Sequence, residues 1–99
     1  MSEVKEPVQW YVYVLRTAAG LLYTGISTDP ARRLGEHQGG RRGARSLRGK
    51  GPLTLLWQTP APDRASASVL EARIKRLSRA RKLALVAGEE IPPVSWELP

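Results

Sequence analysis

The chain has 99 residues, which predicts a single small domain with one modest hydrophobic core. It contains no cysteine, which excludes a disulfide framework and a cysteine-based metal site, and no apolar run approaches the ~20 residues of a membrane-spanning helix. Sixteen lysines and arginines outnumber nine acidic residues; the net charge of +7 favours a polyanionic partner, usually nucleic acid, over an incidentally basic surface.

Composition divides the chain into three parts. Residues 1–8 lack the apolar core of a signal peptide, so we expect a disordered lead-in and a cytoplasmic protein without a membrane segment. Residues 9–87 carry the periodic apolar patterns of a folded domain. Residues 88–99 are rich in proline, and we expect them to form an irregular tail.

A β-hairpin is predicted at the start of the domain. Trp10–Leu15 is rich in aromatic and β-branched residues, and Leu21–Ser27 is the expected return strand after a turn in which Gly20 is free to take positive φ. Side chains alternate between the faces of a strand. We therefore expect Tyr13 to pair opposite Tyr23, so that both phenols lie side by side on one face; simple core packing of the two rings is the alternative.

The first helix is predicted from Pro30 to about His37 or Gln38. Asp29 is placed to cap its free N–H groups, and proline at the first helical position costs no hydrogen bond. Arg33 and His37 are four residues apart, so they share one face of this helix.

A basic, glycine-rich segment follows at residues 39–51. Its composition suits contacts with phosphate groups, and a solvated flexible loop is the alternative. The cations in this segment are Arg41, Arg42, Arg45, Arg48 and Lys50.

A third strand is predicted at Leu53–Thr59, bounded by Pro52 and Pro60. Two helices should follow, at Arg64–Leu77 and Arg79–Ala87, with Asp63 and Ser78 as their candidate N-caps. The resulting order, β-β-α-β-α-α, predicts an α/β (α+β) fold with a small, mainly antiparallel three-stranded sheet flanked by helices.

Glu71 is the single acid among seven basic residues between Arg64 and Lys82. Its i,i+4 spacing to Lys75 permits a surface ion pair. A carboxylate in such a basic setting also suits a divalent metal ion beside phosphate. The spacing leaves both interpretations open.

Read together, these residues resemble the GIY-YIG nuclease superfamily, in its small stand-alone bacterial branch. The family opens with a hairpin bearing two tripeptides, followed by an arginine, often a histidine one turn later, and a glutamate on a later helix. The matching residues are Tyr11-Val12-Tyr13, Tyr23-Thr24-Gly25, Arg33, His37 and Glu71. The resemblance covers about residues 9–87.

The resemblance implies a role for each matching residue. Glu71 would bind one Mg²⁺ or Mn²⁺ ion, and Arg33 would hold the scissile phosphate with its planar fork. Tyr23 would be the general base for the attacking water, with Tyr13 positioning water or phosphate. His37 would accept the proton, since its unperturbed pKa lies near ~6.5.

Three further positions bear on the resemblance. Gly25 would allow close backbone approach beside the site. Tyr11 stands where the family usually has glycine. Leu83–Val86 occupy a window in which many members have an asparagine, and Lys82 is the residue expected to serve in its place.

The resemblance therefore implies a divalent-metal-dependent nuclease that hydrolyses DNA with low sequence specificity, in DNA repair or nucleic-acid processing. A non-catalytic nucleic-acid-binding module is the main alternative, and a protein-interaction domain is a third. The residues expected to contact nucleic acid are Arg32, Arg41, Arg42, Arg45, Arg48, Lys50, Lys75 and Lys82. The oligomeric state does not follow from the sequence.

Overall fold

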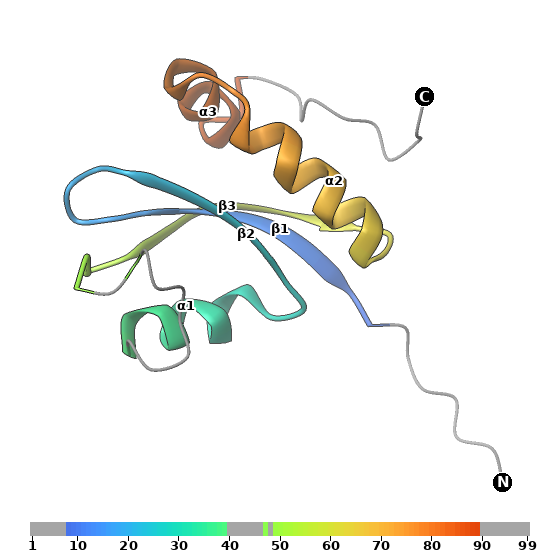
Figure 1. The fold of residues 1–99 in the computed structure, drawn as a ribbon, viewed down its shortest axis with the longest axis horizontal. Coiled ribbons are helices and arrows are strands. Elements are labelled where there is room, and N and C mark those ends of the chain that lie inside the picture. Colours follow the sequence, from blue (N-terminus) through green and yellow to red (C-terminus); the bar gives the residue numbers. More distant parts are fainter. Residues whose placement is uncertain (1–7, 40–46, 48, 90–99) are drawn as a thin grey trace, which may run out of the picture.

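The computed structural model describes residues 8–39, 47 and 49–89. Its elements are β1 (Trp10–Arg16), β2 (Leu22–Ser27), α1 (Pro30–Gly39), β3 (Thr54–Ala61), α2 (Arg64–Lys75) and α3 (Arg79–Val86). The three strands form one antiparallel sheet in the order β2-β1-β3 (Figure 1). This confirms the predicted fold class and element order.

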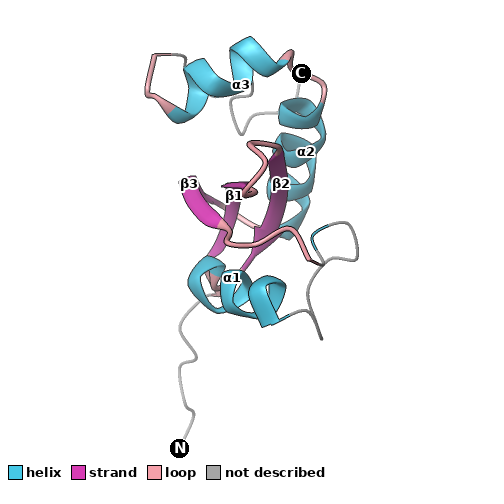
Figure 2. Cartoon of the chain, turned by 90° about the vertical axis from the view of Figure 1, so that its left-hand side faces the viewer, coloured by secondary structure: helices cyan, strands magenta, loops and turns pink. Residues whose placement is uncertain are grey.

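Helices cover both faces of the sheet. Helix α1 lies on one side, and α2 and α3 lie on the other (Figures 1 and 2). Successive side chains of the central strand β1 point to opposite faces. Val12 and Val14 therefore pack beneath α2 and α3, whereas Tyr13 and Leu15 belong to the core on the α1 side.

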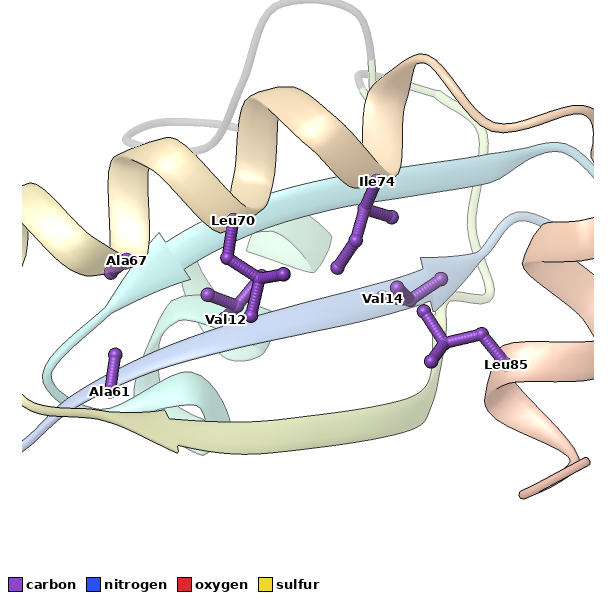
Figure 3. Close-up of a cluster of buried hydrophobic side chains, with 7 residues drawn as sticks. All are labelled: Val12, Val14, Ala61, Ala67, Leu70, Ile74 and Leu85. Atoms are coloured by element: carbon purple, nitrogen blue, oxygen red, sulfur yellow. The ribbon is translucent and has the colours of Figure 1, made fainter. Parts of the chain in front are cut away.

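The larger core lies between the sheet and helices α2 and α3 (Figure 3). Its buried members are Val12, Val14, Ala61, Ala67, Leu70, Ile74 and Leu85. The helical members recur every three or four residues, as predicted for an amphipathic helix lying on a sheet. The smaller core on the α1 side contains Tyr13, Leu15, Leu47 and Leu53.

The hairpin register differs from the prediction by two residues. Tyr13 pairs with Gly25, and Tyr23 pairs with Leu15, so the two tyrosines are diagonal neighbours and do not stand directly opposite each other. The loop closes through a 2.9 Å bond from the Thr17 N–H to the Leu21 carbonyl, with Gly20 inside it at φ 90°. A two-residue shift preserves the alternation of faces, so both phenols still share one face.

The third strand is longer than predicted. We expected it to end before Pro60, but β3 continues through Pro60 to Ala61, which pair with Tyr11 and Trp10. Strand β3 is an edge strand, and the missing N–H of proline is tolerated there because one side of the strand needs no ladder bond.

The predicted helix caps are confirmed. Asp29 accepts a 3.1 Å bond from the Arg32 N–H, Asp63 accepts one of 2.7 Å from Ser66, and Ser78 one of 3.2 Å from Arg81. Helix α2 ends at Lys75, two residues before the predicted end.

Several expectations lie outside the described residues. These concern most of the N-terminal lead-in, nearly all of the C-terminal tail, and four cations of the basic segment, Arg41, Arg42, Arg45 and Arg48. Among the described helices, none is both long enough and apolar enough to cross a membrane.

Candidate active site

A buried tyrosine–histidine pair lies at the centre of the α1 face. Tyr13 comes from the middle strand and is 1% exposed; His37 comes from the last turn of α1 and is 2% exposed. The Tyr13 hydroxyl oxygen lies 3.0 Å from His37 Nε2. Each group therefore satisfies a hydrogen-bonding need of the other.

Gly25 makes room for this contact. It lies opposite Tyr13 in the sheet, and a Cβ placed on it would be 2.5 Å from the Tyr13 hydroxyl oxygen and 2.7 Å from Cζ. The tyrosine ring therefore crosses directly over the backbone of β2 to reach the histidine. A residue with any side chain would block that path.

Replacing Gly25 with alanine should displace the Tyr13 ring and break its hydrogen bond to His37. We expect a loss of about 1–3 kcal/mol in the free energy of unfolding, as is usual for overpacking a core. Denaturant titration measures this loss. Gly35→Ala is the matched control, because a Cβ at that exposed position in α1 meets nothing within 4 Å. Equal stability of the two variants would contradict the argument.

Tyr23 completes a cluster of three rings. Its ring centroid is 6.5 Å from that of Tyr13 and 5.4 Å from that of His37, which it meets edge-on. Tyr23 is half-buried, and within the described chain no residue hydrogen-bonds its hydroxyl. This phenol is therefore available to a water molecule or to a phosphate oxygen.

Arg33 lies between an acid and the ring cluster. Its Nη1 donates to Glu36 Oε1 at 3.0 Å, and its positive charge favours the ionised form of Tyr13. Arg32 approaches the other oxygen of Glu36 at 4.0 Å, from a side chain that is 72% exposed. The carboxylate of Glu36, by hydrogen bond and charge, raises the pKa of Arg33, so this cation stays charged throughout any working pH.

The burial of these groups shifts two pKa values in opposite directions. Burial, with smaller contributions from Tyr23 and Glu71, raises the pKa of Tyr13 to about 12, although Arg33 opposes the shift. Burial and the nearby charge of Arg33 lower the pKa of His37, with Glu36 opposing. Near neutral pH, Tyr13 is therefore protonated and His37 is neutral.

The lowered pKa of His37 makes stability depend on pH. The unfolded chain takes up a proton near pH ~6.5, whereas the folded chain resists protonation, so stability should fall as the pH drops through that value. His37 is the only histidine, so NMR of its ring protons reports its pKa directly. We expect a midpoint below ~6.5 and a smaller loss of stability on acidification in His37→Gln. A midpoint above that value would contradict the desolvated setting.

Glu71 approaches the site from the opposite side of the sheet. It lies on α2, which packs against β1 and β2, and its side chain is 23% exposed. Its charge makes only a small contribution to the raised pKa of Tyr13, which comes mainly from burial. Lys75 Nζ lies 3.5 Å from Glu71 Oε2. The ion pair that the i,i+4 spacing permits therefore forms.

The carboxylate of Glu71 suits a weakly held Mg²⁺ or Mn²⁺ ion. No group of three or more histidine, cysteine or acidic residues occurs in the described part of the chain, which argues against a structural zinc site there. Mg²⁺ commonly binds through one or two carboxylates, with water and substrate phosphate completing its shell. Glu71 is the residue that would hold it.

The remaining sequence-predicted residues are dispersed. Lys50 is exposed beyond the end of the α1 face, and Lys82 is half-buried on α3, where no described contact joins it to Glu71 or to the rings. Glu36 was given no role from the sequence, although its i,i+3 spacing to Arg33 predicts the ion pair that forms.

A separate depression of about 480 Å³ lies at the hairpin loop, away from the rings. Its lining residues are Arg16, Thr17, Ala18, Ala19, Gly20, Pro52 and Thr54. None of these belongs to the candidate site.

The chain is similar to several known proteins. A family model described as the GIY-YIG catalytic domain matches residues 9–84. A UPF0213 protein of Sodalis glossinidius is 58% identical over 82% of this chain and 75% of its own length. A UPF0213 protein of Pectobacterium carotovorum is 56% identical over 90% of this chain and 89% of its own. For a UPF0213 protein of Aeromonas hydrophila, 56% identical, the match covers 82% of this chain but only 59% of the relative.

A similar solved structure is also known. The solution NMR structure of a UPF0213 protein from Bacillus halodurans is 37% identical to this chain, with a TM-score of 0.53. The match covers 82% of this chain and 85% of that one.

Proposed function

The chain belongs to the GIY-YIG family, with UPF0213 proteins as its relatives, and from this membership we propose that it is a divalent-metal-dependent nuclease that hydrolyses phosphodiester bonds in DNA. The observation that supports this most strongly is the 3.0 Å contact between the Tyr13 hydroxyl and His37 Nε2. This contact pairs a protonated phenol with a neutral imidazole, beside the proposed phosphate-binding residue Arg33. Such a pair can remove a proton from water, as general base catalysis requires.

In this proposal the pair works as a proton relay. The attacking water gives its proton to the Tyr13 oxygen while the Tyr13 proton passes to His37 Nε2, so no free phenolate has to form. A pKa of about 12 makes a free phenolate rare at neutral pH, which favours the relay over prior ionisation. The water oxygen bonds to phosphorus, and the bond to the leaving oxygen breaks.

In this relay Tyr13 accepts the proton of the attacking water, which is the role of general base that the resemblance implies for Tyr23. Tyr13 has an imidazole at hydrogen-bond distance, whereas the Tyr23 hydroxyl has no such partner among the described residues. We propose that Tyr23 orients the water or a phosphate oxygen. Its ring also holds the imidazole plane by edge-on contact at 5.4 Å between centroids.

Two charged residues complete the proposed site. Arg33 presents several N–H donors in one plane, which suits the non-bridging oxygens of the scissile phosphate. Glu71 would hold the divalent ion, which when bound offsets charge on the phosphate and on the leaving oxygen. Contacts of this kind are made to the backbone and not to base edges, so we propose low sequence specificity and a role in DNA repair or nucleic-acid processing.

Removal of metal ions separates this proposal from its main alternative. We expect labelled single-stranded, duplex or branched DNA to be cut in the presence of Mg²⁺, and EDTA to stop the reaction while salt-sensitive binding persists. Gel analysis of the products measures both. Binding without product at any Mg²⁺ concentration would support a non-catalytic nucleic-acid-binding module. Absence of salt-dependent binding would favour a protein-interaction domain.

A further inference from the structure

Three charged residues form one stripe along helix α2. Lys75 follows Glu71 by four residues, and Arg64 precedes it by seven, so all three lie on the same side of the helix. With a rise of about 1.5 Å per residue, Lys75 lies about 6 Å and Arg64 about 10 Å from Glu71, in opposite directions along the axis.

Both cations of this stripe are exposed yet restrained. Lys75 is held by Glu71 at 3.5 Å, with 55% of its side chain exposed. The Arg64 guanidinium lies over the Trp10 ring, 5.6 Å from its centroid, and none of the described acids forms an ion pair with it. Such contacts lower the entropy lost when a phosphate binds.

Helix α2 lies along β1, the strand that carries Tyr13, on the opposite face of the sheet from that ring. Ala67, Leu70 and Ile74 pack in sequence along Val12 and Val14, so α2 and β1 advance together across the sheet (Figure 3). Arg64, near the start of α2, accordingly lies beside Trp10, three residues before Tyr13.

We propose that one strand of the nucleic-acid substrate runs along α2, with its scissile phosphate at Glu71 and flanking phosphates at Lys75 and Arg64. This inference rests on the proposed function, which it extends by assigning a substrate path and a new binding residue, Arg64. The charges of one duplex strand succeed one another about every 3.4 Å along the duplex axis, so both cations lie within a few nucleotides of the cleavage point.

The same helix offers a matched control. Successive residues are rotated by about 100°, which places Arg76 about 140° around the helix from Glu71. Arg76 is exposed and, like Arg64, makes no ion pair with a described acid. Replacement of Arg76 removes the same charge from the same end of the molecule without touching the stripe.

Fluorescence anisotropy with a labelled DNA duplex in EDTA tests the path without cleavage. We expect Arg64→Gln and Lys75→Gln each to weaken binding about eightfold at 0.1 M salt and to reduce the slope of log K against log[salt] by about one. Arg76→Gln should change affinity less than about twofold. Lys75→Arg should restore binding, and matching thermal midpoints would show that each variant is folded.

An equal loss of DNA affinity in all three glutamine variants would contradict the proposed substrate path, because it would indicate a general effect of net charge. Unchanged affinity in Arg64→Gln and Lys75→Gln would overturn it too. If the wild-type protein cuts DNA with Mg²⁺ in either of these cases, the proposed function stands and only the path fails. If the wild type neither binds nor cuts, the proposed function and the path fail together.

Discussion

Replacing Glu71 with glutamine is expected to lower the rate of DNA cleavage roughly a thousandfold, which corresponds to about 4 kcal/mol of transition-state stabilisation. Glutamine keeps the size of the side chain but removes the charge that would hold a divalent ion. Glu71 is the residue to which the proposed function assigns the ion, and its charge also contributes to the raised pKa of Tyr13. Single-turnover cleavage at saturating Mg²⁺ measures the effect.

Glu89→Gln is the matched control for this substitution. Glu89 is an exposed acid after the end of α3, so the same chemical change there should leave the cleavage rate within about twofold of the wild type. If Glu71→Gln cuts DNA at the same rate as Glu89→Gln, Glu71 does not belong to the proposed site.

Replacing Tyr13 with phenylalanine is expected to lower the single-turnover rate by about 10²–10⁴, the usual range for loss of a general acid–base group. The ring over Gly25 is kept, but the hydroxyl that joins the water to His37 is lost. DNA affinity in EDTA should be almost unchanged. The buried imidazole loses a partner, so the free energy of unfolding should fall by about 1–3 kcal/mol.

Two other tyrosine substitutions test whether the loss of rate is specific to the hydroxyl of Tyr13. Tyr11→Phe removes a hydroxyl from the same strand outside the ring cluster and should leave the rate unchanged. Tyr23→Phe should lower the rate less than Tyr13→Phe, because His37 remains coupled to Tyr13. Full activity in Tyr13→Phe with complete loss in Tyr23→Phe would reverse the roles proposed for the two phenols.

Features that depend on near neighbours in the chain were predictable from the sequence. The caps at Asp29, Asp63 and Ser78 follow from side chains placed three residues before the N–H groups they satisfy. The shared face of Tyr13 and Tyr23 follows from the alternation of side chains along strands. The order of strands and helices follows from the change of apolar period between 2 and 3.6.

Features that depend on tertiary structure were not predictable in the same way. Alternation fixes the face of Tyr13 but permits shifts of two residues, and the observed pairing with Gly25 accompanies a loop that closes between Thr17 and Leu21. Pro60 could be placed in a strand only once β3 was known to lie at the edge. The spacing in α1 put His37 near Arg33, yet the choice of Tyr13 as its partner depends on the space above Gly25.

The central claim is that one carboxylate from α2 and the ring cluster beneath α1 share a metal-dependent site. Titration of the protein with Mn²⁺, in complex with a DNA analogue that cannot be cleaved, tests this most directly through the NMR signals of the Tyr23 and His37 rings. We predict that substoichiometric Mn²⁺ broadens both signals in the wild type and leaves them sharp in Glu71→Gln. Equal broadening in the two proteins, or none in either, would contradict the account.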